Sequence, residues 1–207
     1  MKYMYQNILS SNQTDLLPLI SDFSKQFYLV GGTAIALQIG HRESIDFDLF
    51  TAKPFKRNLI KKNLGKFGFP YQVIFEDGDQ LHMLINDTKL TFYEYPYPIE
   101  ASVAFDQIIY MPNLLSLGAM KAFALGKRAK WRDYVDLYFL LRNHFGLAEL
   151  IAHSENIYSG MFNAKLFLEQ LTYYQDVDYR QPISFVSTSV SNREIEDFLT
   201  DLAVNGL

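Results

Sequence analysis

A glycine pair followed at a fixed distance by two alternating acids is the feature that most limits how this chain can fold. An apolar run, Phe27–Val30, leads directly into Gly31 and Gly32. Asp46 and Asp48 follow one helix length later, with an apolar residue between them. This order predicts a strand, a helix that opens on the glycines and a second strand that carries both acids. Residues two apart on a strand point to the same face, so the two carboxylates are expected to project together.

The residue types at these positions predict a site for a metal ion beside a phosphate group. Two adjacent carboxylates repel each other unless a cation lies between them, and oxygen ligands suit Mg²⁺. Gly31 and Gly32 let the backbone approach a phosphate closely, at the positive end of the helix that follows. Thr33 keeps a hydroxyl that can bond a phosphate oxygen, cap the helix, or do both. A phosphate-binding helix start beside an acid pair is the arrangement that nucleotidyl transfer requires.

The composition predicts a globular chain that is not a membrane protein. Of the 207 residues, 49% are apolar and 20% are charged. No apolar run approaches the roughly 20 residues that are needed to cross a bilayer. The chain has no Cys, which excludes a thiolate metal site and fits a reducing compartment. Residues 1–10 lack the apolar core of a signal peptide, and we therefore expect the protein in the cytoplasm.

The charge distribution is more informative than the net charge. A net charge of −4 argues against binding nucleic acid through overall basicity. Basic residues nevertheless gather in two segments, one on either side of the proposed site in the sequence. Such clusters fit solvated helix faces as well as a phosphate-binding surface. They comprise Lys53, Lys56, Arg57, Lys61, Lys62 and Lys66 in the first segment, and Lys121, Lys127, Arg128, Lys130 and Arg132 in the second.

The apolar pattern changes at about residue 111 and predicts an α/β (α+β) fold with a helical C-terminal part. Strands and helices mix before that point, which indicates a catalytic unit at residues 1–111. Helical periodicity then indicates a helical part at residues 112–207. Turn signals at Asp77-Gly78 and Asn86-Asp87 separate the middle strands. The expected strands lie at 27–30, 44–50, 71–76, 81–86, 89–95 and 107–111, and the expected helices at 12–26, 33–40, 54–67, 114–125, 133–142, 147–157, 163–175 and 192–203.

Four motifs occur in a fixed order over roughly residues 20 to 145. They read Gly31-Gly32-Thr33, His41-Arg42-Glu43-Ser44, Asp46-Phe47-Asp48-Leu49-Phe50 and Lys130-Trp131-Arg132-Asp133-Tyr134-Val135-Asp136-Leu137. In order and separation they resemble the AbiE-type (AbiEii/AbiGii) abortive-infection toxins, which are bacterial members of the DNA polymerase β-like nucleotidyltransferase superfamily. The resemblance implies a nucleotidyltransferase fold, in which a mixed sheet is flanked by helices, followed by a C-terminal helical part.

The resemblance also implies a role for each motif in handling an NTP. In the family the two acids hold Mg²⁺, so Asp46 and Asp48 are the candidate metal ligands. The residues alone leave simpler roles open, since Arg42 can pair with Asp46 and Asp133 can stabilise a helix start. Ser44 can bond either a backbone group or a phosphate. The nucleotide-binding candidates are Gly31, Gly32, Thr33, Arg42, Ser44, Lys121, Lys130 and Arg132, with Asp133 and Asp136 as acids that hold the basic side chains in place.

The chain departs from the family at a third acid. The family often carries this acid on a later strand, and here the matching position in Lys89–Tyr93 is Thr91. The third carboxylate usually orients or deprotonates the attacking hydroxyl, and a threonine hydroxyl cannot act as the base at neutral pH. Glu76 or Asp77 could reach the site from a neighbouring strand, whereas Glu94 would face away. Otherwise the protein works with one tightly held metal, uses a substrate group as base, or has lost catalysis. We keep Thr91 as the third catalytic position.

The predicted function is enzymatic: transfer of a nucleotidyl group from an NTP to an acceptor. The resemblance implies that the acceptor is RNA, such as the 3′ end of a tRNA, within a toxin–antitoxin or phage-defence system with a cognate antitoxin as partner. A second hypothesis is a catalytically degenerate module that binds nucleotide, RNA or a partner protein, which Thr91 and the aromatic segment Tyr93–Pro98 favour. A third, a small-molecule transferase, needs an acid-lined cleft for a cationic substrate, and the sequence has no further acid cluster for it.

Overall fold

The computed structural model describes residues 3–186 and 188–206, which form two compact units. The N-terminal unit extends to Asn113 and the C-terminal unit begins at Leu114. The first unit mixes strands and helices, and the second is helical in the residues that the structure describes. The mixed α/β class expected from the sequence is confirmed. We describe each unit by itself.

The N-terminal unit is built on a five-stranded mixed sheet with the order β1-β2-β5-β4-β3. The central strands β2 and β5 are parallel, and the other neighbours are antiparallel. Parallel neighbours need a long crossover, and the chain between β2 and β5 supplies it with a helix and two strands. The strands are β1 (Tyr28–Val30), β2 (Asp46–Thr51), β3 (Tyr71–Asp77), β4 (Gln80–Ile85) and β5 (Thr88–Glu94).

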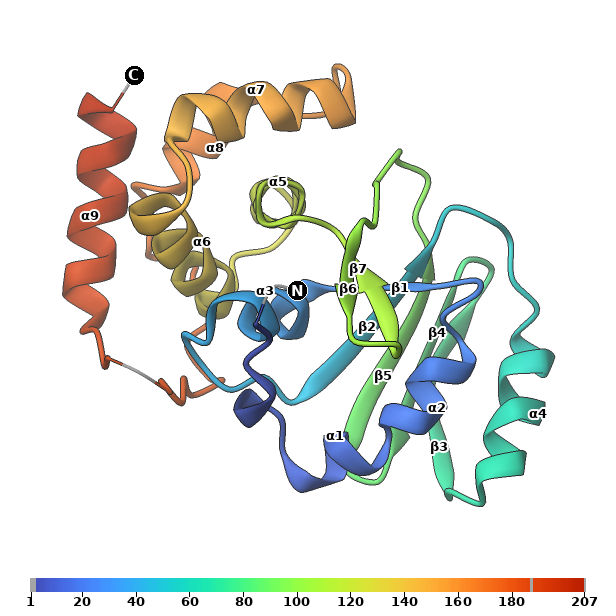
Figure 1. Cartoon of the computed structure of the whole chain (residues 1–207). Coiled ribbons are helices and arrows are strands. Elements are labelled where there is room, and N and C mark those ends of the chain that lie inside the picture. The colour runs from blue at the N-terminus through green and yellow to red at the C-terminus, as the bar shows by residue number, and fades with distance from the viewer. Residues whose placement is uncertain (1–2, 187, 207) are drawn as a thin grey trace. The chain divides into compact units, whose positions relative to one another are not determined.

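Helices cover one face of this sheet (Figure 1). Phe23, which follows α2, packs edge-on against Phe92 of β5 with ring centroids 5.0 Å apart. The unit also has a separate two-stranded hairpin, β6 (Val103–Phe105) with β7 (Ile109–Met111). Its helical elements are the 3₁₀ turn η1 (Gln6–Ile8) and the helices α1 (Ser11–Asp15), α2 (Leu17–Asp22), α3 (Gly31–Ile39) and α4 (Arg57–Phe67).

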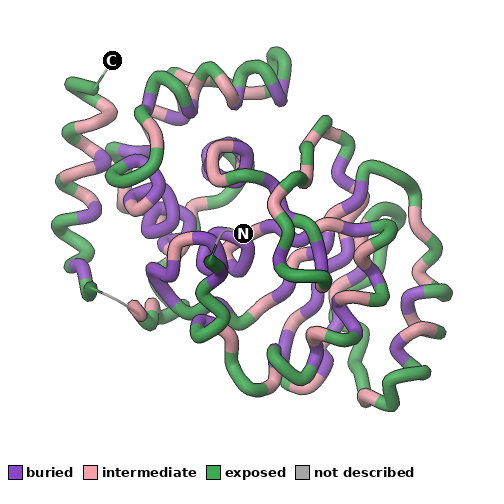
Figure 2. Tube along the Cα trace, viewed as in Figure 1, coloured by how far each residue is buried: buried purple, intermediate pink, exposed green. Residues whose placement is uncertain are grey.

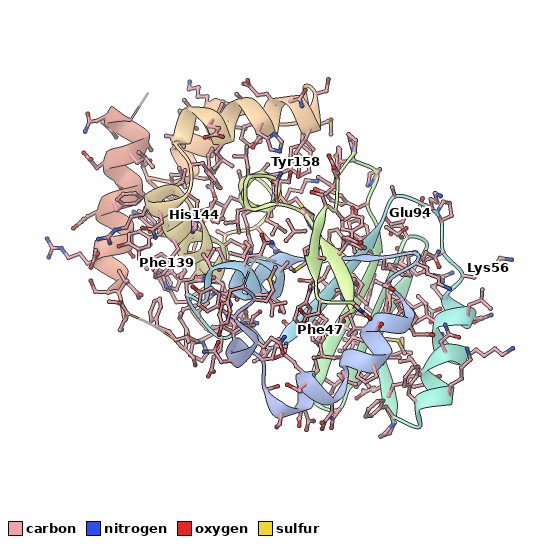
Figure 3. The ribbon with its side chains drawn as sticks, viewed as in Figure 1. Phe47, Lys56, Glu94, Phe139, His144 and Tyr158 are labelled. Carbon is pink, nitrogen blue, oxygen red and sulfur yellow. The ribbon has the colours of Figure 1, made fainter. Side chains whose placement is uncertain are left out.

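The two faces of the sheet differ in burial and in chemistry. On β2, Phe47 and Leu49 are fully buried toward the helices, whereas Asp46, Asp48 and Phe50 are only half-buried. Figure 2 colours each residue by its burial, and buried residues alternate with less buried ones along β4. On β5, Leu90, Thr91 and Phe92 are all buried. Phe47 is labelled in Figure 3 within this core. We call the opposite face the polar face, and its residues on β2, β5 and β4 are Asp46, Asp48, Phe50, Lys89, Thr91, Tyr93, Gln80, His82 and Leu84.

Two expectations about the N-terminal unit are wrong. The single helix expected at residues 12–26 is two helices, because the chain turns at Leu16 and Pro18 stands in the first turn of α2. Proline has no N–H to continue the ladder of a preceding helix. The strand β6 (Val103–Phe105) was not expected, because three residues carry too short a pattern to reveal a strand. The other strands and α-helices of this unit lie where the apolar pattern placed them, within a few residues at each end, and the 3₁₀ turn η1 was not expected.

The C-terminal unit consists of helices packed on one another. Tyr138 of α6 meets Phe198 of α9 edge-on, with ring centroids 5.1 Å apart, and Phe123 of α5 stacks on Tyr158 of α7 at 3.9 Å. Among residues 3–186 and 188–206, no helix is both long and apolar enough to span a bilayer. The helices are α5 (Leu114–Leu125), α6 (Trp131–Asn143), α7 (Leu147–Tyr158), α8 (Ala164–Gln170) and α9 (Asn192–Asn205).

Candidate functional site

The glycine pair opens α3, as the sequence predicted. Gly31 is the first helical residue and has a φ of +73°, a conformation that glycine adopts without the steric cost of a side chain. The residue before it, Val30, is the N-cap and has no side-chain hydrogen bond to the helix. The first-turn N–H groups of a helix lack intrahelical partners, so a start capped by no side chain suits an anion.

Both glycines are required by the side chains that lie against them. A Cβ on Gly31 would overlap Oδ2 of Asp48. A Cβ on Gly32 would overlap the guanidinium of Arg42 and would lie 3.3 Å from Oγ of Ser44. The close approach therefore brings the start of α3 against an acid of β2 and against the motif that precedes β2. Five of the predicted site residues, from three sequence motifs, meet at this point.

Thr33 has a different role from the one expected of a helix cap. Its side chain is buried, and its hydroxyl bonds Oγ of Ser44 at 2.8 Å and donates to the backbone carbonyl of Asp46. The N-cap position belongs to Val30, so the alternative of Thr33 as N-cap is wrong. The hydroxyl ties α3 to the start of β2 and fixes the strand that carries the acids.

Arg42 and Ser44 are buried beside the same junction. Arg42 is 2% exposed, and its Nη1 donates to the carbonyl of Glu43 at 2.9 Å. A buried guanidinium satisfied by the protein braces the chain between α3 and β2, and that bracing fixes the approach of Asp46 and Asp48 to the helix start.

The register of the sheet places Thr91 next to the acid pair. Asp48 of β2 lies opposite Thr91 of β5, and Thr91 lies opposite His82 of β4. Cross-strand partners project to the same face, so Asp48, Thr91 and His82 form one row on the polar face. Thr91 therefore lies one strand from Asp48 on the same face of the sheet, and its assignment as the third catalytic position stays a prediction. Residues 85 and 88 flank a two-residue turn and set this register.

The other candidates for the third acid lie elsewhere. Glu76 is in register with Leu81, a core residue, and its carboxylate pairs with Lys61 at 2.7 Å and Arg57 at 3.4 Å. These contacts lower the pKa of Glu76, chiefly through the bond to Lys61. Asp77 is on the edge strand β3, opposite Gln80 of β4, and its Oδ1 accepts a hydrogen bond from the N–H of Gly78. Glu76 and Asp77 therefore do not stand beside Asp48.

His82 is a member of this row that the sequence analysis did not single out. It is half-buried, its Nε2 lies 3.2 Å from Oε1 of Gln80, and its ring meets Phe75 edge-on. Burial lowers the pKa of His82, Lys89 lowers it further, and the negative charge of Asp48 opposes the shift. The signal was present in the sequence, because a two-residue turn at Asn86-Asp87 pairs residue 82 with residue 91 by counting outward.

In the C-terminal unit, Lys121 lies between two acids of α6. Its Nζ is 2.6 Å from Asp133 Oδ1 and 2.7 Å from Asp136 Oδ2, and all three side chains are buried. Arg128 adds a contact of 3.2 Å to the other oxygen of Asp133, and about half of its side chain is exposed. The acids hold Lys121 in a fixed position, and Asp133 uses its carboxylate for this network.

The remaining predicted residues of that unit lie at the start of α6. Lys130 is the exposed N-cap residue, and Arg132 donates to the carbonyl of Pro182 at 3.2 Å. Trp131 is 3% exposed and lies against Tyr134 and Tyr179, so it is a core residue of this unit. The side chains that face outward at this helix start are basic.

The acid pair of β2 suits Mg²⁺ in its donor atoms. Mg²⁺ is commonly held by one or two carboxylates, with substrate phosphates and water completing its shell. Asp46 and Asp48 supply two carboxylates on one face, and the glycine at position 31 leaves room for the carboxylate of Asp48. Within the part of the chain that the structure describes, no group of three or more acidic, His or Cys side chains gathers to hold a metal. The residues present therefore fit an ion shared with a phosphate substrate.

Comparison with known proteins identifies the family. The family model described as "Nucleotidyl transferase AbiEii toxin, Type IV TA system" matches residues 18–91, the segment that contains the glycine pair, the acid pair and Thr91. An uncharacterized protein of Aquifex aeolicus (strain VF5), aq_aa25, is 33% identical over 155 residues, which are 72% of this chain and 74% of that protein. The chain belongs to the AbiEii nucleotidyltransferase toxin family. The resemblance inferred from the four motifs is confirmed.

Solved structures agree with this AbiEii-family fold. A putative nucleotidyltransferase from H. pylori superposes with a TM-score of 0.57 at 16% identity and covers 93% of this chain and 92% of its own. The nucleotidyltransferase toxin MenT4 from Mycobacterium tuberculosis H37Rv superposes with a TM-score of 0.57 at 15% identity, over 93% of this chain and 82% of its own. At these identities the likeness concerns the fold, which is that of a nucleotidyltransferase.

Proposed function

We propose that this AbiEii-family protein transfers a nucleotidyl group from an NTP to a hydroxyl of RNA, such as the 3′ end of a tRNA. The observation that carries the proposal is the junction of α3 with β2. There the helix start at Gly31, which no side chain caps, lies against the carboxylate of Asp48. An anion site next to a pair of carboxylates provides what a triphosphate and its metal ion need.

Each residue at the junction has a defined task in this proposal. Asp46 and Asp48 hold Mg²⁺, which neutralises triphosphate charge and polarises the α-phosphoryl group when it is bound. The backbone N–H groups at the start of α3 bind phosphate oxygens. Thr33, through its bonds to Ser44 and Asp46, keeps the helix start and the acid strand in register. Lys121, Lys130 and Arg132, which lie in the C-terminal unit, remain proposed nucleotide-binding residues on the resemblance to the family alone.

The reaction follows from these tasks. The hydroxyl oxygen of the acceptor forms a bond with the α-phosphorus, and the bond to the bridging oxygen breaks as pyrophosphate leaves. As a toxin, the protein would modify the host's own RNA in the cytoplasm and would be restrained by a cognate antitoxin. The family supports the toxin–antitoxin setting, and the substrate is our proposal.

The direct test is label transfer with a matched pair of variants. The protein is incubated with cellular RNA, Mg²⁺ and each labelled NTP in turn, and label in RNA is measured. Asp46→Asn should abolish labelling, because it removes one of the two carboxylates. Asp15→Asn, an exposed acid of α1 outside the site, should label as the wild type does. If the wild-type protein labels no RNA with any NTP, the transferase proposal is wrong.

One observation favours a second function, a binding module without chemistry. Thr91 stands one strand from Asp48, where the family often has an acid, so the N-terminal unit lacks the usual carboxylate base. On this alternative, NTP or RNA binds without turnover, and the toxic phenotype survives Asp46→Asn. Calorimetry separates the two cases further: the transferase binds NTP more tightly with Mg²⁺ than without it, and Asp48→Ala removes that difference.

A further inference from the structure

The row Asp48–Thr91–His82 carries an inference about how the acceptor hydroxyl loses its proton. The three residues are register partners on three adjacent strands, so they project from the polar face side by side. Neighbouring strands lie about 4.8 Å apart, which puts the Cα atoms of Asp48 and His82 roughly 10 Å from each other. Thr91 has a short side chain and lies between the two longer ones.

The surroundings of His82 indicate which nitrogen can accept a proton. The tautomer with its hydrogen on Nε2 donates that hydrogen to Oε1 of Gln80, 3.2 Å away. Nδ1 then carries the lone pair. The Phe75 ring, 5.4 Å away and nearly edge-on, supports the imidazole from the edge strand. The side chain is half-buried, which limits its rotation and still leaves it accessible.

The charged groups around His82 favour the neutral imidazole. Lys89 of β5 lies two residues before Thr91 on the polar face, and its charge opposes a second positive charge on His82. Tyr93 of β5 and Asp77 of β3 lie on the same face on the other side of the row. Burial is the largest cause that lowers the pKa of His82, and the carboxylate of Asp48 acts in the opposite direction. A neutral imidazole is the form that can take up a proton.

We propose that His82 is the general base of nucleotidyl transfer in this protein and replaces the carboxylate that Thr91 does not supply. This inference rests on the proposed transferase function. The 3′ hydroxyl of the acceptor gives its proton to Nδ1 of His82 while its oxygen bonds to the α-phosphorus. The bond from the α-phosphorus to the bridging oxygen breaks, and pyrophosphate leaves with the electron pair. The imidazolium then releases its proton to water, and the imidazole is restored.

The first test is kinetic and uses the full chain. His82→Gln should lower the single-turnover rate of RNA labelling by about a hundredfold or more, the range of general base catalysis, without weakening NTP binding. The wild-type rate should fall as the pH drops through the pKa of His82, which burial holds below the ordinary value of about 6.5, and the variant should lose this dependence. His153→Gln is the matched control, because His153 is also half-buried with a pKa lowered by burial, and it lies in the C-terminal unit.

A second variant separates a base from a merely structural residue. Thr91→Asp places a carboxylate beside Asp48, so in the His82→Gln background it should restore at least about a tenth of the lost rate. A residue needed only for folding would not be rescued in this way. Thermal unfolding of each variant shows whether the fold is retained.

The third measurement does not involve turnover. NMR titration of the imidazoles should find a His82 pKa below the ordinary value, and Asp48→Asn should lower it further because an opposing charge is lost. Asp15→Asn should leave it unchanged. If His82→Gln labels RNA as fast as the wild type does, the role of His82 is overturned and the transferase proposal stands. Absence of labelling by the wild type itself overturns both.

Discussion

The two acid pairs of this protein have the same charge and opposite environments. Asp46 and Asp48 are two apart on a strand and half-buried, and Asp133 and Asp136 are three apart on a helix and fully buried. Both spacings place two carboxylates on one face. A buried charge needs a partner from the protein, and Lys121 supplies it between the helical acids. A half-buried pair can instead exchange its partner with solvent and substrate, which is what a metal site must do.

The position of an acid pair on a fold decides whether the pair stabilises the structure or takes part in chemistry. The pair on β2 lies at the start of α3 and can add an ion and a phosphate to its contacts. The pair on α6 has already been neutralised by a side chain of α5. We therefore expect substitutions in the helical pair to change stability and substitutions in the strand pair to change activity.

The largest effect is expected at Lys121. Lys121→Met removes the cation that Asp133 and Asp136 share, and both carboxylates stay buried. It should therefore lower the free energy of unfolding by about 3–5 kcal/mol. Lys127→Met is the control, because Lys127 is exposed and its ammonium lies over the ring of Phe123, 4.2 Å from the ring centroid. That change should cost less than about 1 kcal/mol. Chemical denaturation measures both, and equal costs would show that the network adds no stability.

The strand pair should respond in the opposite sense. Asp48→Asn should lower transfer activity by about a hundredfold, equivalent to about 2.7 kcal/mol of activation free energy, because one metal ligand is neutralised. Its free energy of unfolding should stay the same or rise slightly, since the variant relieves repulsion with Asp46. Labelling of RNA and urea denaturation of the same preparation give the two values. A variant that loses stability but keeps activity would reverse our assignment of the two pairs.

Gly31 offers a smaller and more specific test of the site. Gly31→Ala should cost about 1–2 kcal/mol for its left-handed conformation, and its Cβ should also displace the carboxylate of Asp48. Gly68→Ala is the matched control, because Gly68 has a φ of +71° and nothing within 4 Å of a Cβ. Only the change at Gly31 should weaken NTP binding in the presence of Mg²⁺. Equal NTP affinity in both variants would mean that the helix start does not hold the substrate against Asp48.

The sequence predicted the junction of α3 and β2 because its signals are local. The alternation around Asp46 and Asp48, the glycine pair and the helix-length spacing lie within short stretches of sequence. They predict local structure however the rest of the chain packs. It was less informative where a contact depends on packing between distant elements. Lys121 and Asp136 meet only because α5 and α6 pack at a particular angle, and Thr33 turned out to bond β2 instead of capping its own helix.

The row that contains His82 could be predicted from the sequence only in part. Asn86 and Asp87 both have positive φ, as a two-residue hairpin turn requires, so the pairing of His82 with Thr91 follows from a turn signal that was recognised. The pairing of Thr91 with Asp48 does not, since β2 and β5 are parallel strands brought together by the crossover. A residue that belongs to a site through two successive registers is visible from sequence only when both registers are known.

The smallest expected effect concerns Glu76, which inverts the arrangement at Lys121: one exposed acid lies between two cations, Lys61 and Arg57. Lys61 is the main cause of its lowered pKa. A carboxyl with a depressed pKa in the folded state adds stability above its unfolded pKa of about 4.3, and this stability is lost as the pH falls through the folded pKa. Glu76→Gln should therefore change the unfolding curve slightly at pH 7, and this change should disappear as the pH falls through the folded pKa of Glu76. Solvent screens exposed pairs, so the difference should shrink further in high salt. A Glu76→Gln effect as large as that of Lys121→Met would mean that burial does not set the strength of these ion clusters.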